Sequence, residues 1–414
     1  MKGKKIQNFL YTCTVAASLL SLSIYTLTRE PTESSLSENR MLASVKNLGD
    51  TSYADGTFQA GVENALSDQF PYREEIVRLK KKEERKFTVV QAPPEPITVL
   101  HKMPDINVYE LGTSDRMING VGEYSQEKAD RYAARADQIN KLSIRHPQAA
   151  IYVYYPTQVN ETSLFDKDNN ITAAGPQMIQ LLQNTLTVPF KTLDIPDIET
   201  YERLFFMSDH HPNYQGSRQI YEDIMTMIGK TDQILAPSAT VCAGDFYGTF
   251  ASRTGYTTKP DQFCMYDYDL PDYDIYDENN QLQNDAYQSR HDFAVNHASI
   301  QGEYPYYYAL CYTAFQPIMR FDTKQEDLGN CLIVGDSYST SVADLLAANF
   351  HETWLLYPYL YTQKYQKLFD YDHFIEDNKI TTVIYMLTGE NYYYVDQYED
   401  RYTETVILPN GGNY

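Results

Sequence analysis

Two short segments carry side chains that together can activate a serine. Ser337 follows the apolar run 331–334, and Gly335 between them permits a sharp turn into the next segment. A serine at a helix N-terminus directs its backbone N–H toward a developing oxyanion. Its hydroxyl needs an imidazole as base, and the imidazole needs a carboxylate that fixes its tautomer. Asp209 and His211, which follow another apolar run, supply both groups.

A third segment, Gly389-Glu390-Asn391, comes just after the apolar run 380–387. An Asn amide at a strand end can point into the same cleft as the serine and add a second oxyanion donor. His210 is adjacent to the proposed base, and Tyr338 is adjacent to the proposed nucleophile. Together with Asn391 and Gly335, they are the predicted oxyanion-binding or substrate-binding residues.

Each of these motifs also has a simpler interpretation. A serine after a strand is an ordinary helix N-cap. Asp209, His210 and His211 can begin a metal site or form a structural histidine pair. The remaining six histidines stand singly, without the spacing of metal ligands, so the sequence predicts neither a metal nor a cofactor.

The elements that position these residues follow an alternating pattern. Short apolar runs, typical of strands, alternate with segments of helical periodicity. Such alternation predicts parallel pairing and a doubly wound α/β sheet, in which ligands lie at the carboxyl ends of the strands. The expected strands are 149–155, 192–195, 331–334, 353–357 and 380–387, and the expected helices are 127–142, 214–228, 342–350 and 374–378.

The α/β domain is expected over residues 95–414. A Tyr-, Asp- and Gly-rich insertion at about 233–330 interrupts its periodicity. Residues 29–94 are interpreted as a polar spacer followed by a long exposed helix, which runs from Phe58 into the lysine-rich segment 80–86.

The N-terminus resembles a membrane anchor. Residues 6–28 carry no charge and exceed the about 20 residues needed to span a bilayer. Three lysines precede them, which predicts a cytoplasmic tip and a single-pass anchor at 1–28, with the remainder extracytoplasmic. A cleaved signal peptide is the alternative.

The charge of the chain bears on whether it binds nucleic acid, and its cysteines bear on whether it forms disulfides. Asp and Glu number 56 against 34 Lys and Arg, a net charge of −22, so binding to nucleic acid is not expected. Cys242, Cys264, Cys311 and Cys331 allow two disulfides in three pairings. A buried free thiol at Cys331 is equally consistent with its apolar run.

These motifs resemble a known family. The segment 335–337 resembles the nucleophile block of SGNH hydrolases, 389–391 resembles their Gly-x-Asn block, and Asp209 with His211 resembles their Asp/His block. Here the Asp/His block precedes the serine. This permuted order resembles the bacterial DHHW family and the SGNH-like O-acetylation proteins of alginate and related exopolysaccharides.

The resemblance extends from Ser37 to Asn391. It includes SENRMLA at 37–43, DQFPYR at 68–73, FYGT at 246–249 and KPD at 259–261. Pro212 stands where the family has Trp, which alters the wall beside the histidine.

The resemblance implies a flavodoxin-like SGNH fold and acyl transfer, with acetyl as the acyl group and a cell-envelope or secreted polysaccharide as substrate. O-acetyltransferase and acetylesterase both stay open, and a multispanning acyltransferase partner is implied for the former. The alternative is a non-catalytic protein that binds or assembles polysaccharide on the same fold. Phosphoesterase chemistry, suggested by the letters Asp-His-His, would need further aspartates as metal ligands.

Overall fold

The structure is a computed structural model of the 414-residue chain. It describes residues 96–394, except 104–106, 256–258, 284–306, 313–315 and 366. Toward the N-terminus it describes 11–14, 17, 21, 24–26, 28–32, 34–35, 40–48, 51–73, 75–76, 79–80 and 83. The chain divides into two compact units, residues 1–87 and 88–414.

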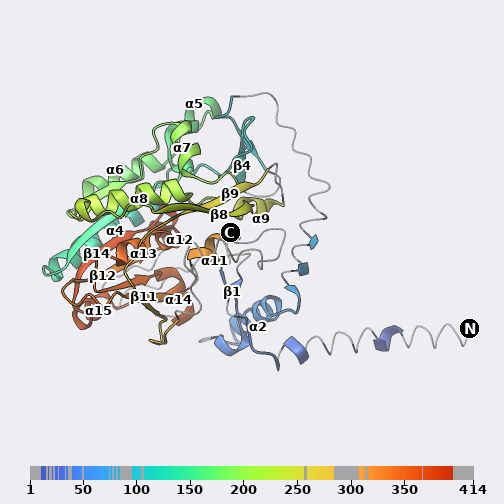
Figure 1. The fold of residues 1–414 in the computed structure, drawn as a ribbon. Helices are drawn as coiled ribbons and strands as arrows, with labels where there is room; N and C mark the ends of the chain where they lie inside the picture. Colours follow the sequence, from blue (N-terminus) through green and yellow to red (C-terminus); the bar gives the residue numbers. More distant parts are fainter. Residues whose placement is uncertain are drawn as a thin grey trace, which may run out of the picture. The chain divides into compact units, whose positions relative to one another are not determined.

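The second unit is built on a seven-stranded mixed sheet (Figure 1). Its order is β10-β11-β13-β12-β14-β6-β7. Five of these strands pair in parallel: β6 (Ala150–Tyr155), β7 (Phe190–Thr192), β12 (Asn330–Gly335), β13 (Glu352–Leu356) and β14 (Ile380–Met386). The predicted α/β fold with a mainly parallel sheet is confirmed. The strand β11 (Ile318–Asp322) pairs antiparallel with β13, and the edge strand β10 (Asp274–Tyr276) pairs antiparallel with β11. Both come from the insertion, which therefore also extends the main sheet.

Helices cover both faces of this sheet, because successive strand residues point to opposite sides. Along β12, Ile333 packs in one apolar core, whereas Leu332 and Val334 pack in the other. The first core contains α7 (Ile198–Leu204), α8 (Tyr214–Met227) and α13 (Ala343–Ala347). The second contains α4 (Gln126–Arg145), α6 (Gly175–Thr185) and α15 (Tyr371–Asp377). Burial on both faces explains why the strands read as unbroken apolar runs.

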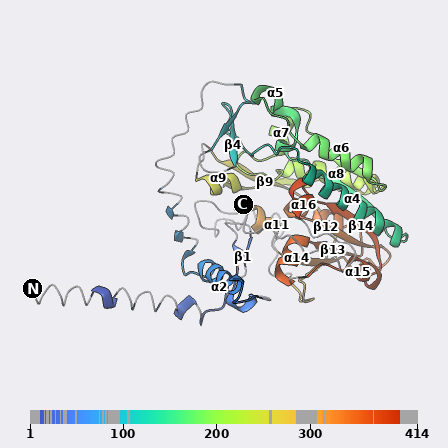
Figure 2. The same ribbon diagram turned by 180° about the vertical axis from the view of Figure 1, so that it is seen from behind.

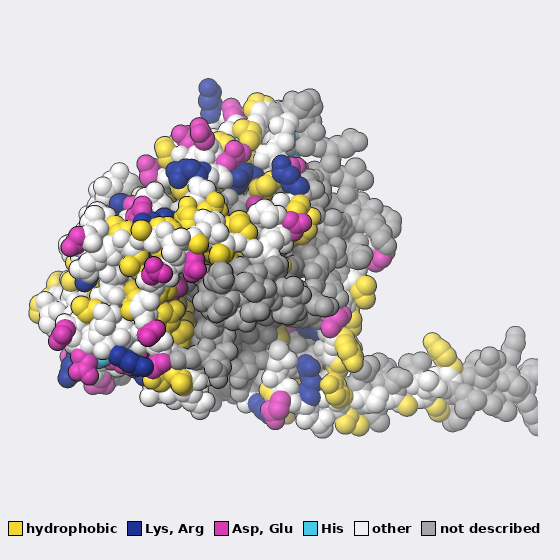
Figure 3. Space-filling model, viewed as in Figure 1, with side chains coloured by type: hydrophobic (Ala, Val, Ile, Leu, Met, Phe, Trp, Pro, Cys, Tyr) yellow, Lys and Arg dark blue, Asp and Glu magenta, His cyan; other side chains and the backbone are white. Residues whose placement is uncertain are grey.

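Short helices follow the strand ends. α12 (Ser337–Thr340) follows β12, α14 (Pro358–Tyr365) follows β13, and α16 (Gly389–Tyr394) follows β14. Figure 2 shows α16 beside α4, which it contacts. On the face drawn in Figure 3, acidic and basic side chains of the described residues lie interspersed.

The insertion contributes a hairpin of β8 (Ala239–Phe246) and β9 (Asp261–Asp267), with α9 (Thr249–Thr254) between them and α11 (Tyr307–Tyr312) further along the chain. A separate sheet of β3 (Leu100–Lys102), β4 (Val108–Leu111) and β5 (Met117–Asn119) precedes α4. A disulfide joins Cys242 to Cys264 across the hairpin, whereas Cys311 and Cys331 are free thiols. Cys331 is fully buried, as the alternative interpretation of its apolar run expected.

Replacing Cys242 and Cys264 together by Ala should lower the free energy of unfolding by about 3 kcal/mol, because the crosslink closes a loop of 22 residues. Urea unfolding of both proteins, with and without a reductant, measures the effect. Reductant should bring the native protein to the stability of the variant and leave the variant unchanged. Equal stability of the native protein under both conditions would contradict the crosslink.

The first unit differs from the expected long helix. α2 (Thr57–Asp68) ends at Asp68, and the chain turns through Pro71 and Tyr72, which adopts a positive φ of 59°. The turn brings the two motifs of this unit together: Asp68 Oδ2 accepts from Ala43 N at 2.8 Å, and Gln69 Nε2 donates to Ala43 O at 3.0 Å. The described residues 73, 75–76, 79–80 and 83 beyond the turn are helical again, so the prediction was wrong in making the helix continuous.

The predicted membrane anchor falls mostly outside the described residues. Within the described part of the chain, no helix combines the length and the apolar character needed to cross a membrane.

Candidate active site

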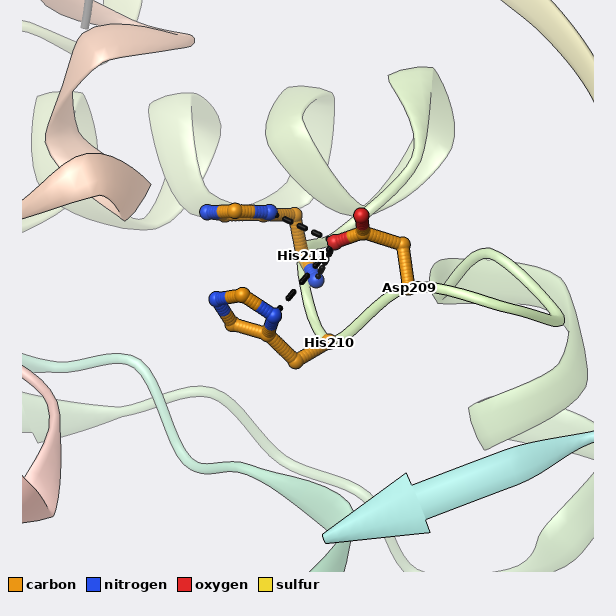
Figure 4. A group of neighbouring side chains, drawn as sticks. All are labelled: Asp209, His210 and His211. Atoms are coloured by element: carbon orange, nitrogen blue, oxygen red, sulfur yellow. Dashed lines mark hydrogen bonds and ion pairs between the residues drawn. The ribbon is translucent and has the colours of Figure 1, made fainter. Parts of the chain in front are cut away.

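The structure brings Ser337, His211 and Asp209 into one hydrogen-bonded chain. His211 Nε2 lies 2.8 Å from Ser337 Oγ, across a sequence separation of 126 residues. His211 Nδ1 lies 2.6 Å from Asp209 Oδ1, which also accepts from the His211 backbone N–H at 2.9 Å. Figure 4 shows the carboxylate against Nδ1, with the other ring nitrogen of His211 directed away. Both distances lie in the range that proton transfer between such groups requires.

Ser337 is positioned by the sheet. It is the first residue of α12, directly beyond β12, and Asp336 caps this helix by accepting from Tyr338 N. Ser337 keeps 7 % of its surface exposed, whereas His211 and Asp209 keep 0 % and 1 %. The serine is thus the member of the three that a reagent can reach.

Asp209 and His211 lie in a loop between α7 and α8. The apolar run before them is not a strand: Leu204 ends α7, and Phe205 makes an isolated bridge with Pro212. Asn213 then caps α8 by accepting from the backbone N–H groups of its first turn. The end of α7 and the start of α8 therefore fix this loop, whereas the sequence pattern suggested that the loop follows a strand.

The electrostatics of the site favour a charged Asp209 and a neutral His210. Burial alone would raise the pKa of Asp209, but the charge and hydrogen bonds of His211 outweigh it and hold that pKa below its ordinary value. Burial, followed by repulsion from His211, lowers the pKa of His210 to about 3. His210 is therefore neutral at neutral pH.

The potential ligand atoms of Asp209, His210 and His211 lie within 4.8 Å of one another, which is close enough for a metal site. Two ligands of a tetrahedral zinc ion, each about 2.1 Å from it, lie about 3.4 Å apart. The 2.6 Å between Asp209 Oδ1 and His211 Nδ1 is instead a hydrogen-bond length. Because His211 Nε2 also binds the serine, the geometry fits a triad better than a metal centre.

Asn391 lies near the predicted place but is oriented differently. Its Nδ2 donates to Asp336 Oδ2 at 2.7 Å and to Thr388 Oγ1 at 3.1 Å. Both amide hydrogens are thereby used, so Asn391 does not offer the second oxyanion donor that the sequence predicts. Asp336 also accepts from Thr388 N and Oγ1, and this carboxylate ties the end of β12 to the end of β14.

We expect Asn391→Ala to act on stability more than on chemistry. Loss of one donor from the buried Asp336 carboxyl should lower the free energy of unfolding by about 2 kcal/mol, with kcat changed by less than about 10-fold. Removing a true oxyanion donor would cost about 10² to 10³ in kcat. Denaturant unfolding and esterase kinetics measure both quantities, with Asn378→Ala as control, because the Asn378 amide donates to the Phe374 carbonyl in its own helix. A 10²-fold fall in kcat at unchanged stability would restore the oxyanion role.

Gly335 and Tyr338 connect the loops. Gly335 closes β12 beside Met386, and a Cβ there would collide with the Ser339 side chain, so the glycine permits close packing of α12. The Tyr338 hydroxyl donates to the backbone carbonyl of His210 and thereby joins the serine segment to the histidine segment. Neither residue shows the predicted substrate-facing role.

The His210 ring packs against the His211 ring, with centroids 3.9 Å apart and planes tilted by 36°, and it lines a small pocket. Asp209, Gln158, Asn119 and Phe250 also line it. Of the predicted substrate-binding residues, His210 borders this pocket.

Sequence reasoning missed several residues that touch the triad. Tyr308 of α11 stacks flat on the His211 ring, at 3.9 Å between centroids and 15° between planes, and its hydroxyl donates to Ser337 O. Thr249 of α9 donates to Asp209 Oδ2. Both belong to the insertion, and the FYGT segment of the resemblance ends at Thr249.

Tyr357, the first residue after β13, also borders the nucleophile. Burial and the nearby Asp336 raise its pKa, and hydrogen bonding from the backbone and side chain of Ser337 only partly offsets this rise. Its phenol therefore stays protonated at neutral pH and is able to donate a hydrogen bond.

No protein-family model and no curated protein matches the chain. Solved structures share its fold. A DHHW family protein from Eubacterium siraeum DSM 15702 is 17% identical, with a TM-score of 0.54, and the match covers 71% of this chain and 95% of that one. Bacillus cereus PatB1 with a sulfonyl adduct is also 17% identical, with a TM-score of 0.51 over 67% and 94% of the two chains. The resemblance to DHHW proteins drawn from the motifs is confirmed at the level of the fold.

Proposed function

We propose that this protein is a serine acyl-transfer enzyme that places acetyl groups on, or removes them from, hydroxyls of a cell-envelope or secreted polysaccharide. The observation that carries the proposal is the 2.8 Å contact between Ser337 Oγ and His211 Nε2, with Asp209 at 2.6 Å on the opposite ring nitrogen. An alcohol, an imidazole and a carboxylate in this order constitute the arrangement that activates a serine.

In the first half-reaction, Ser337 Oγ attacks the acyl carbonyl carbon while His211 Nε2 takes its proton. The tetrahedral intermediate collapses as His211 returns that proton to the departing alcohol, which leaves an acetyl ester on Ser337. In the second, a sugar hydroxyl or water attacks this ester, His211 takes the new proton, and Ser337 Oγ leaves and recovers it. The two possible acceptors separate transferase from esterase.

The developing oxyanion needs donors directed at it. The Ser337 backbone N–H at the start of α12 is one such donor.

The acetyl group, the polysaccharide and the need for a multispanning acyltransferase that delivers acetyl across the membrane follow from the motif resemblance. A membrane-anchored, extracytoplasmic location follows from the lysines and uncharged run at the N-terminus, and the Cys242–Cys264 disulfide supports an oxidising compartment.

The test is covalent trapping. PatB1, which shares this fold, is known with a sulfonyl adduct. We therefore expect phenylmethylsulfonyl fluoride to modify this protein once, on Ser337, as read by intact mass and peptide mapping, and to abolish hydrolysis of a chromogenic acetyl ester. The second hypothesis, a non-catalytic polysaccharide-binding protein, predicts retained carbohydrate binding with no adduct. Activity lost on chelation would favour metal-dependent phosphoesterase chemistry instead.

A further inference from the structure

The two oxygens of the Asp209 carboxylate have separate partners. Oδ1 faces His211 and accepts from its ring and its backbone N–H. Oδ2 accepts from Thr249, at 2.6 Å from the backbone N and 2.9 Å from Oγ1. The acid is therefore held from both sides, and the second side belongs to the insertion.

Neighbouring groups of the insertion hold the same loop. Asp261, at the start of β9, accepts from Met207 N at 2.8 Å and from Ser208 Oγ at 3.1 Å. Gly248 N donates to Ser208 Oγ at 2.9 Å, and a Cβ on Gly248 would collide with the Asp209 side chain. We call Gly248, Thr249 and Asp261 the insertion clamp.

The hairpin that carries the clamp is itself well fixed. The backbone of Phe246 at the end of β8 pairs with Asp261, and the Cys242–Cys264 disulfide crosses the same two strands. The Phe250 backbone N–H donates to Ser208 O at 2.9 Å, one residue before the acid. The position of Thr249 relative to Asp209 is thus set by several independent contacts.

We propose that Thr249 is a positioning residue for the acyl-transfer reaction, an inference that rests on the proposed function. A carboxylate rotates easily about χ2, because its torsional preference is broad and two-fold. Two donors on Oδ2 stop this rotation and keep Oδ1 in line with His211 Nδ1. The imidazole then keeps Nε2 free of a proton and aimed at Ser337. A misplacement of this kind costs up to about 100-fold in rate.

Thr249→Val removes the hydroxyl donor but keeps the shape and the backbone N–H. We expect the second-order rate constant for sulfonylation by phenylmethylsulfonyl fluoride, and kcat for acetyl-ester hydrolysis, to fall by about 10-fold or more with KM nearly unchanged. Thr249→Ser should restore both to within about 2-fold, because it restores the donor. Thr254→Val is the matched control: it lies in the same helix, and its hydroxyl binds the Phe250 carbonyl.

A second readout does not depend on turnover. The short contact between His211 Nδ1 and Asp209 should place its shared proton far downfield in the proton NMR spectrum of the full chain. Thr249→Val should shift or broaden this resonance, whereas Thr249→Ser and Thr254→Val should keep it. Thr249→Ala, which adds no methyl group in place of the hydroxyl, replaces the Val variant if that variant folds poorly.

The inference is overturned if Thr249→Val, folded by circular dichroism, reacts at the native rate and keeps the downfield resonance. An equal loss in Thr249→Ser would also overturn it, because the threonine methyl group and not the donor would then matter. A native protein that shows no sulfonylation contradicts the proposed function, and the NMR comparison then decides the Thr249 contact separately.

Discussion

Ser337→Ala is expected to abolish covalent labelling and to lower kcat/KM for an acetyl ester by about 10⁵-fold or more. Ser337 Oγ is the atom that forms the acyl bond, and His211 Nε2, the base, lies 2.8 Å from it. Oxyanion stabilisation and substrate binding still give the variant a residual rate, but no acyl-enzyme forms. Intact mass after incubation with phenylmethylsulfonyl fluoride should show the unmodified chain.

The variant should stay folded, because alanine is tolerated at a helix start and the removed oxygen leaves little space. Circular dichroism and thermal unfolding check this. Ser125→Ala serves as control: Ser125 is exposed, and its hydroxyl also lies at a helix N-terminus, where it accepts from Lys128 N. The control should label and react like the native protein. Labelling of Ser337→Ala at the native rate would assign the nucleophile to another residue.

Much of the site could be predicted because its chemistry is local in sequence. An apolar run followed by Gly-Asp-Ser encodes a strand end and a helix start within a few residues, and the structure forms both there. Asp209 and His211 lie two residues apart, so their contact needs only one turn. To predict the triad, one long-range assumption was needed, namely that the segment of Ser337 meets the segment of Asp209 and His211.

The rest depends on contacts that no local pattern carries. Thr249 reaches Asp209 across 40 residues, and α11 brings Tyr308 onto His211 from still further along the chain. Asn391 could be placed near the strand ends but not oriented, because its orientation follows from the buried Asp336 carboxyl. The strands β10 and β11 belong to a segment of weak periodicity, which concealed the pairing of β10 with β11 and of β11 with β13.

Asp209→Asn is expected to lower kcat by about 10⁴-fold while leaving the geometry of the loop nearly intact. Oδ2 of the native carboxylate accepts two hydrogen bonds from Thr249, and Oδ1 accepts from His211 Nδ1. An asparagine has one acceptor oxygen for the two pairs of donors, Thr249 on one side and the ring and backbone N–H of His211 on the other. With that oxygen toward Thr249, its NH₂ group faces His211 Nδ1. Nδ1 then becomes the acceptor, the ring proton moves to Nε2, and the imidazole cannot take a proton from Ser337.

The same variant changes the pH dependence of stability. The pKa of Asp209 is held below its ordinary value of 3.8 in the fold, chiefly because His211 outweighs the effect of burial. The charged carboxylate therefore stabilises the fold above pH 3.8, and this contribution is lost as the pH falls toward the folded pKa. In Asp209→Asn the free energy of unfolding should fall less steeply with acidification over this range, as urea unfolding at a series of pH values measures.

Asp197→Asn separates this mechanism from the general cost of replacing an aspartate. Asp197 is an exposed helix cap that accepts from Thr200 N at 2.7 Å, so its replacement should leave kcat unchanged. Combining Asp209→Asn with Ser337→Ala should give little further loss beyond Ser337→Ala alone, because the members of a triad act as one unit. If Asp209→Asn retained more than about a tenth of the native kcat, the acid would not be setting the tautomer of His211, and the chemistry proposed for this site would have to proceed without it.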